Sequence, residues 1–146
     1  MHIRCLIVVA LSLSLCWLHN AKSQEKKTDS DRIQGSWKII KVEVEGKPPP
    51  AEFVEKGKFV FNGNKVSIYQ GDTMMEEATF ALDSAKKPPT IDLTATAALG
   101  KGKITYGIYR IEGDTLTLCI GDKRPSEFKA QAEVGVLQMK RVKAEK

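Results

Sequence analysis

The chain has 146 residues, with 23 Lys and Arg, 18 Asp and Glu, a formal net charge of +5, two His and three Cys, which is enough for one domain with a modest core. Both histidines, His2 and His19, lie in the first 23 residues, so a chain processed after Ser23 would lack the imidazole of Ser-His-Asp, Cys-His and most catalytic zinc sites. Lys and Arg are scattered without interleaved aromatics, which excludes a nucleic-acid partner.

The first 23 residues are typical of a signal peptide. A short basic start leads into an apolar run over residues 5–18, which is too short to span a bilayer comfortably. Small residues at Ala21 and Ser23 predict cleavage before Gln24. We expect an exported protein, periplasmic or extracellular, with no transmembrane segment after cleavage. The alternative is a lipid anchor on Cys16, although the bulky Leu15 precedes it.

Residues 24–31 are polar and predict a flexible leader, and residues 32–146 predict one β-domain. The β-branched run over residues 36–45 indicates the first strand, which three consecutive prolines, Pro48 to Pro50, bring to an end. Residues 51–55 have the length of a single helical turn. Such a turn would suit a cap over one mouth of a barrel.

Seven further strands are predicted, separated by turn signals such as Asn62-Gly63-Asn64. They cover residues 58–61, 65–69, 73–82, 90–94, 104–111, 115–120 and 136–142. Eight short strands without a long helix favour an all-β, antiparallel, up-and-down barrel of eight strands. A two-sheet β-sandwich is the alternative, because the spacing of strands in the sequence does not separate the two folds.

Several motifs together resemble one family. They are Gln34-Gly35-Ser36-Trp37, Gly46-Lys47-Pro48, Pro88-Pro89-Thr90-Ile91-Asp92-Leu93-Thr94, Gly107-Ile108-Tyr109, Gly113-Asp114-Thr115-Leu116-Thr117-Leu118-Cys119 and Arg124-Pro125-Ser126-Glu127-Phe128. With these motifs, residues 33–142 resemble the lipocalin-like domain family of secreted proteins of the planctomycete type. The resemblance implies that Trp37 of the Gly35-Ser36-Trp37 motif plugs one end of the barrel and that Arg141 of the last strand covers its indole. The alternative is that Trp37 is an ordinary core residue without arginine cover.

Alternating apolar positions give the residues expected to face the interior. They are Ile39, Phe59, Phe61, Val66, Ile68, Ala78, Phe80, Leu82, Ile91, Leu93, Tyr109, Leu116, Leu118, Leu137 and Met139. Because a barrel of this size can be filled by side chains alone, a filled interior or a small cavity is favoured. The strand over residues 104–111 is apolar on both faces, so its inward side stays open, and Tyr106 and Ile108 are candidates for an outer apolar patch.

Candidate ligand contacts are Phe61, Ile68, Phe80 and Tyr109 on the apolar wall, with Tyr109 or Arg124 as a polar group at the rim. Cys119 is expected to be a buried, inert thiol on the face opposite Leu118. No residue pattern predicts a catalytic group, a metal site or a cofactor. Asp92 is expected to pair with a lysine of a neighbouring strand, and Arg124 with Glu127.

These observations favour a non-enzymatic exported module that binds a small apolar ligand or an envelope protein. The second hypothesis is a structural or protein-interaction module with a filled barrel. A hydrolase that uses two carboxylates is third, since paired acids across a cleft can cleave glycosides.

Overall fold

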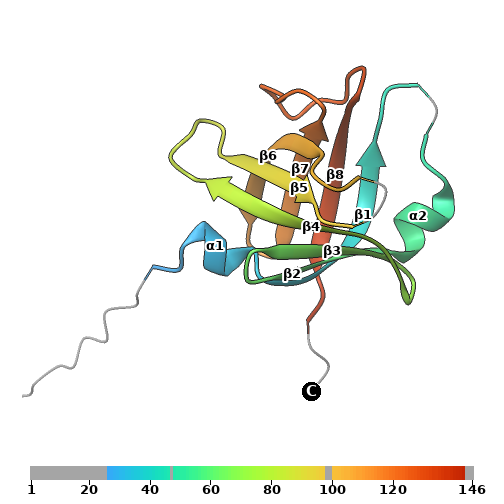
Figure 1. Cartoon of the computed structure of the whole chain (residues 1–146), viewed down its shortest axis with the longest axis horizontal. Coiled ribbons are helices and arrows are strands. Elements are labelled where there is room, and N and C mark those ends of the chain that lie inside the picture. The colour runs from blue at the N-terminus through green and yellow to red at the C-terminus, as the bar shows by residue number, and fades with distance from the viewer. Residues whose placement is uncertain (1–25, 47, 98–99, 144–146) are drawn as a thin grey trace, which may run out of the picture.

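The computed structural model describes residues 26–46, 48–97 and 100–143. The predicted signal peptide and Cys16 lie outside the described residues. The elements in chain order are α1 (Asp29–Arg32), β1 (Gly35–Glu43), α2 (Ala51–Lys56), β2 (Gly57–Asn62), β3 (Lys65–Gln70), β4 (Thr73–Asp83), β5 (Thr90–Ala95), β6 (Ile104–Glu112), β7 (Thr115–Gly121) and β8 (Val134–Arg141), as Figure 1 shows. All eight predicted strands are present, with ends that differ from the expected ones by no more than two residues.

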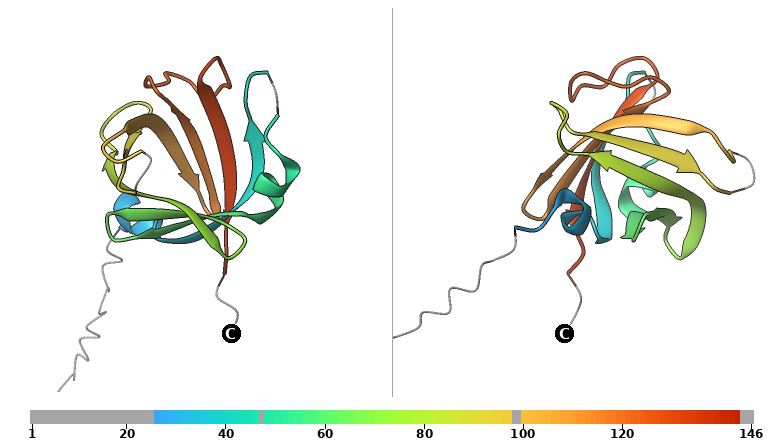
Figure 2. Two further views of the ribbon diagram at one scale, coloured as in Figure 1. Left: turned by 45° about the vertical axis from the view of Figure 1, so that its right-hand side comes forward. Right: turned by 60° about the vertical axis from the view of Figure 1, so that its left-hand side comes forward.

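The strands form one closed barrel in chain order. Each strand pairs antiparallel with the next, and β1 pairs with β8, where Trp37 lies opposite Arg141 and Val42 opposite Leu137. Both views in Figure 2 show the red β8 beside the cyan β1. The predicted eight-stranded up-and-down barrel is therefore confirmed, and the β-sandwich is excluded, because pairing of the first and last strands leaves no open edge.

The two ends of the barrel are built differently. At one end, tight turns join β2 to β3 and β6 to β7, and Gly63 takes the positive φ of 63° that such a turn needs. This end also carries Trp37 and Arg141 and is the closed end below. At the other end, longer connections join β1 to β2 through α2 and β7 to β8 through residues 122–133. This second end is the open mouth.

Side chains fill the interior. Thirteen of the fifteen residues expected to face inward are buried in the main apolar cluster, and the other two, Ile68 and Leu82, are half-buried and packed against it. At the closed end the Phe61 and Phe80 rings meet edge to face, with centroids 5.2 Å apart. The prediction of a filled interior or a small cavity is therefore confirmed for this part of the barrel.

The inward side of β6, which the sequence left open, is now assigned. Tyr109 and Ile111 join the main cluster inside the barrel, whereas Ile108 faces outward and packs with Cys119 and Val136 in a second, smaller cluster. Phe128 and Ala130, from the connection between β7 and β8, cover this second cluster. The expectation of a free outer patch at Ile108 is wrong, because the chain's own loop buries it to 1% exposure.

Candidate functional site

The closed end is organised around Trp37, which is fully buried. Its indole Nε1 donates a 2.7 Å hydrogen bond to the Ile33 carbonyl oxygen, so the one polar atom of the ring is satisfied. The Arg141 guanidinium lies 4.2 Å from the ring centroid, within the range of a cation–π contact. The expected arginine cover over the tryptophan is confirmed.

Arg141 also binds the backbone that leads into β1. Its Nη1 donates to the Gln34 carbonyl at 2.7 Å and its Nη2 donates to the Arg32 carbonyl. Between these carbonyls and Trp37, Gly35 adopts φ = 107°, and an added Cβ would lie 3.3 Å from Nη1 of Arg141. Gly35 is therefore required both by its backbone conformation and by the close approach of the guanidinium.

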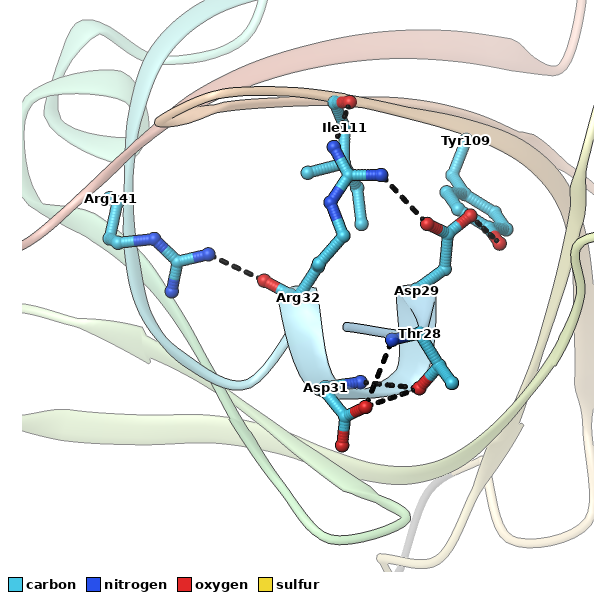
Figure 3. A network of polar contacts seen from close by, with 7 residues as sticks. All are labelled: Thr28, Asp29, Asp31, Arg32, Tyr109, Ile111 and Arg141. Atoms are coloured by element: carbon cyan, nitrogen blue, oxygen red, sulfur yellow. Dashed lines mark hydrogen bonds and ion pairs between the residues drawn. The ribbon is translucent and has the colours of Figure 1, made fainter. Parts of the chain in front are cut away.

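The short helix α1 covers the closed end, as Figure 3 shows. Thr28 and Asp31 form a capping box, with reciprocal hydrogen bonds that start the helix. The Thr28 hydroxyl and backbone N–H hold the pKa of the Asp31 carboxyl below its usual value. Arg32 pairs with Asp29 at 2.9 Å and donates to the Ile111 carbonyl at 2.8 Å, which attaches α1 to the end of β6.

The expectation of a flexible leader through Asp31 is wrong for its last residues. Asp29 to Asp31 are helical and pack on the barrel, because Ile33, at the end of the helix, is fully buried and the Asp29 carboxylate accepts a hydrogen bond from a residue of β6. That donor is the Tyr109 hydroxyl, at 2.8 Å. Burial raises the pKa of Tyr109 well above its usual value, and the Asp29 carboxylate adds to this effect. The phenol therefore stays protonated and donates the hydrogen bond.

The open mouth contains an apolar groove of about 520 Å³. Its wall comes from β1, β2, β3, β4, β7 and β8 and from α2, which stands at this end as predicted. The residues of this mouth groove are Val42, Val44, Pro49, Phe53, Phe59, Ile68, Met75, Glu76, Ile120, Gly135 and Leu137. Ten of these eleven residues are uncharged, and Glu76 is the exception.

The mouth groove continues into a smaller recess of about 100 Å³ between β2, β3, β4, β5, β6 and β7. The two spaces share four residues, Phe59, Ile68, Glu76 and Ile120. The recess adds Val66, Ala78, Leu93, Ala95, Gly100, Lys103 and Thr105. A ligand lying in the groove can therefore extend one end toward the barrel interior, where the packed core stops it.

The structure separates the five predicted ligand contacts into three places. Ile68 lines the mouth groove and the recess. Phe61 and Phe80 pack against each other at the closed end, and Tyr109 is held by Asp29 under α1. Arg124 lies on the outside of the barrel. A single pocket formed by all five residues is not present in the part of the chain that the structure describes.

Arg124 supports the outer wall of the barrel. It donates to the Gly107 carbonyl at 2.9 Å, pairs with Asp92 and places its guanidinium 5.2 Å from the Tyr106 ring centroid. The expected partners, Glu127 for Arg124 and a lysine for Asp92, are both wrong. Asp92 and Tyr106 lie opposite each other on β5 and β6, so they present a carboxylate and a ring side by side to the loop that carries Arg124.

The sequence signal for the mouth groove was present in part. Ile120 continues the inward row of Leu118 by simple alternation. Val42 continues the inward row of Ile39, but only after an irregularity in the pairing of β1 with β8. Glu76 continues the inward row of Ala78, but a charged residue at this position predicts that the inward row has ended and that the strand is exposed. Phe53 had no usable signal, since a single helical turn has no periodicity to show its buried face.

Cys119 is fully buried, as expected, and its Sγ donates to the Glu127 carbonyl at 3.4 Å. Burial raises the pKa of this thiol, which keeps it in the unreactive protonated form.

Comparisons with protein families, curated proteins and solved structures find no match. In the described ranges, neither helix has the length and apolar character that crossing a membrane requires.

Proposed function

We propose that this protein is an exported, non-enzymatic, lipocalin-like module that binds a small apolar ligand at the open mouth of its barrel. The observation that carries the proposal is the mouth groove, an apolar space of about 520 Å³ that opens beside α2 and leads to the recess. A volume of this order is typical of small-molecule sites, which combine a mostly apolar wall with a few polar groups. The sequence resemblance to the lipocalin-like domain family supports the same proposal.

The shape of the space limits how such a ligand would bind. The recess holds only about 100 Å³, and the buried Phe59 and Val66 stand on its wall next to the packed core. A ligand would therefore insert a short apolar end and leave most of its length in the mouth groove. This binding mode differs from that of a barrel whose whole interior is a cavity.

The sequence is compatible with two other functions. A protein-interaction module with a filled barrel agrees with the packing of the closed half, but it gives the apolar mouth groove no role. A carboxylate hydrolase needs two acids across a cleft. Glu76 is the one acidic residue on the wall of the described mouth groove or recess, which favours a binding role over hydrolysis.

Fluorescence titration of the purified mature protein with phenylnaphthylamine, a neutral apolar probe, tests the proposal. We expect saturable binding that Ile68→Ser weakens about fivefold to tenfold, because the variant removes apolar wall from both spaces. Ile104→Ser makes the same change at a position outside both spaces and is expected to bind as the parent does. Absence of saturable binding, or equal weakening by both variants, would contradict the proposal.

Export rests on the pattern of residues 1–23 and is tested separately. Intact-mass measurement of protein collected from its own host is expected to give a chain that begins at Gln24. A lipid-modified Cys16 at the new N-terminus would instead assign a membrane anchor.

A further inference from the structure

Glu76 occupies an unusual position at the mouth. On β4 it follows an irregularity in the pairing with β3, after which Ile68 lies opposite Glu76 and Val66 opposite Ala78. Since side chains alternate along a strand, Glu76 shares the inward row of Ala78 and Phe80. Glu76 is solvent-exposed at the open mouth. Its side chain lies on the wall of both the mouth groove and the recess, together with Phe59, Ile68 and Ile120.

The structure gives this carboxylate no internal counter-charge. Among the residues that the structure describes, no Lys or Arg nitrogen lies within 4.0 Å of Glu76, and no hydrogen bond to its side chain is present. Lys103 also lines the recess, but its Nζ pairs with Asp122 at 3.0 Å. The neighbouring Glu77, on the outer face, pairs with Lys65.

An uncompensated carboxylate on an apolar wall selects the charge of a ligand. A cation with an apolar body would gain a charge-assisted hydrogen bond with Glu76 and lose no contact with the wall. The carboxylate would repel an anion at the junction of the two spaces, and a neutral molecule would gain no charge-assisted hydrogen bond from it.

We propose that the natural ligand class is a cationic amphiphile, an apolar chain or ring system that carries an ammonium group, and that Glu76 accepts the hydrogen bond from that group. The inference rests on the proposed function, since it names the ligand class of the same mouth groove. Glu76 lies where the mouth groove and the recess meet. The ammonium would therefore sit at this junction, with its apolar body against Phe53 and Val42 in the mouth groove.

Displacement of bound phenylnaphthylamine by three single-chain molecules of equal length tests this inference. Dodecylammonium, dodecanol and dodecanoate have the same chain length and carry a cationic, a neutral and an anionic head group, and each is used below the concentration at which it aggregates. We expect dodecylammonium to bind about fivefold to tenfold more tightly than dodecanol, and dodecanoate to bind more weakly than dodecanol.

Two variants locate the effect. Glu76→Gln keeps the size of the side chain and removes its charge, so the preference for ammonium over alcohol should disappear while dodecanol binds as before. Glu77→Gln removes the same charge one residue away on the outer face and should keep the preference.

The outcomes are distinct. Equal binding of ammonium and alcohol by the parent protein, or a preference that survives Glu76→Gln, overturns the ligand class and leaves the mouth groove as a neutral apolar site. Preference for dodecanoate also overturns it and points to Lys103. Failure of the probe and of all three molecules to bind overturns the proposed function itself.

Discussion

Trp37 and Arg141 come from the first and last strands, which pair with each other, and their side chains stack at the closed end of the barrel. The resemblance of Gly35-Ser36-Trp37 to a family motif predicted this pair correctly. The same motif did not show that Ile33, just before it, is also fully buried. An apolar residue between polar neighbours has no pattern that distinguishes core from surface.

Replacing Trp37 with Ala is expected to lower the free energy of unfolding by about 3 to 5 kcal/mol, because a large buried ring is lost from the closed end. Urea unfolding followed by circular dichroism measures this change. Ile104→Ala, at a site 40% exposed, serves as the control and should cost well under about 1 kcal/mol. A near-neutral Trp37→Ala would mean that the indole does not hold the barrel closed.

Cys119 is expected to react slowly with a thiol reagent in the folded protein and at once after unfolding. Its Sγ is buried beneath residues of the loop between β7 and β8, and its raised pKa leaves little thiolate at neutral pH. Reaction with an aromatic disulfide, followed by absorbance with and without urea, measures both rates. Prompt stoichiometric labelling of the folded protein would show that the loop does not cover this thiol.

At the scale of elements, the strands were predictable and their coverings were not. Alternation and turn residues determine where strands begin and end, and those signals are local. The contact of α1 with β6 joins Asp29 to Tyr109 and Arg32 to Ile111, about eighty residues apart in the sequence. A polar segment shows no sign of such partners, so its sequence predicts a flexible leader.

The hydrogen bond between Tyr109 and Asp29 predicts a loss of stability at alkaline pH. The folded state raises the pKa of Tyr109, while a phenol in the unfolded chain ionises near about pH 10. The stabilisation of the folded state by this hydrogen bond is therefore complete below about pH 10. It is lost as the pH rises further, because the unfolded chain then releases the phenol proton while the folded protein keeps it.

Urea unfolding at about pH 8 and about pH 11 measures the alkaline loss of stability. Tyr109→Phe should reduce the fall in unfolding free energy between the two pH values. Tyr106→Phe makes the same chemical change on the outer face of β6 and should keep the parent fall. An identical fall in all three proteins would show that the Tyr109 hydroxyl is not held by α1.

At the scale of the whole molecule, the barrel follows from the sequence, whereas the site does not. The fold depends on the apolar rows of the strands, and all fifteen predicted inward residues contribute to the main core. The mouth groove depends on where those rows stop being filled. The place where the groove begins depends on α2, on the irregularity in the pairing of β4 with β3, and on the connections at the open mouth. These features are far apart in the sequence and meet only in the folded protein.

The molecule thus has one end that α1 covers and another end that carries the mouth groove. The central claim is that ligands enter at the mouth groove and do not reach the closed end. Trp37 is the one tryptophan after residue 23, so its indole N–H reports on the closed end alone.

The most direct test is an NMR titration of the ¹⁵N-labelled mature protein with dodecylammonium. We predict that the amide signals of Ile68, Glu76 and Ile120 shift in a saturable manner while the Trp37 indole signal stays in place. Shifts concentrated at the Trp37 indole, or no saturable shift at the mouth groove, would contradict the claim.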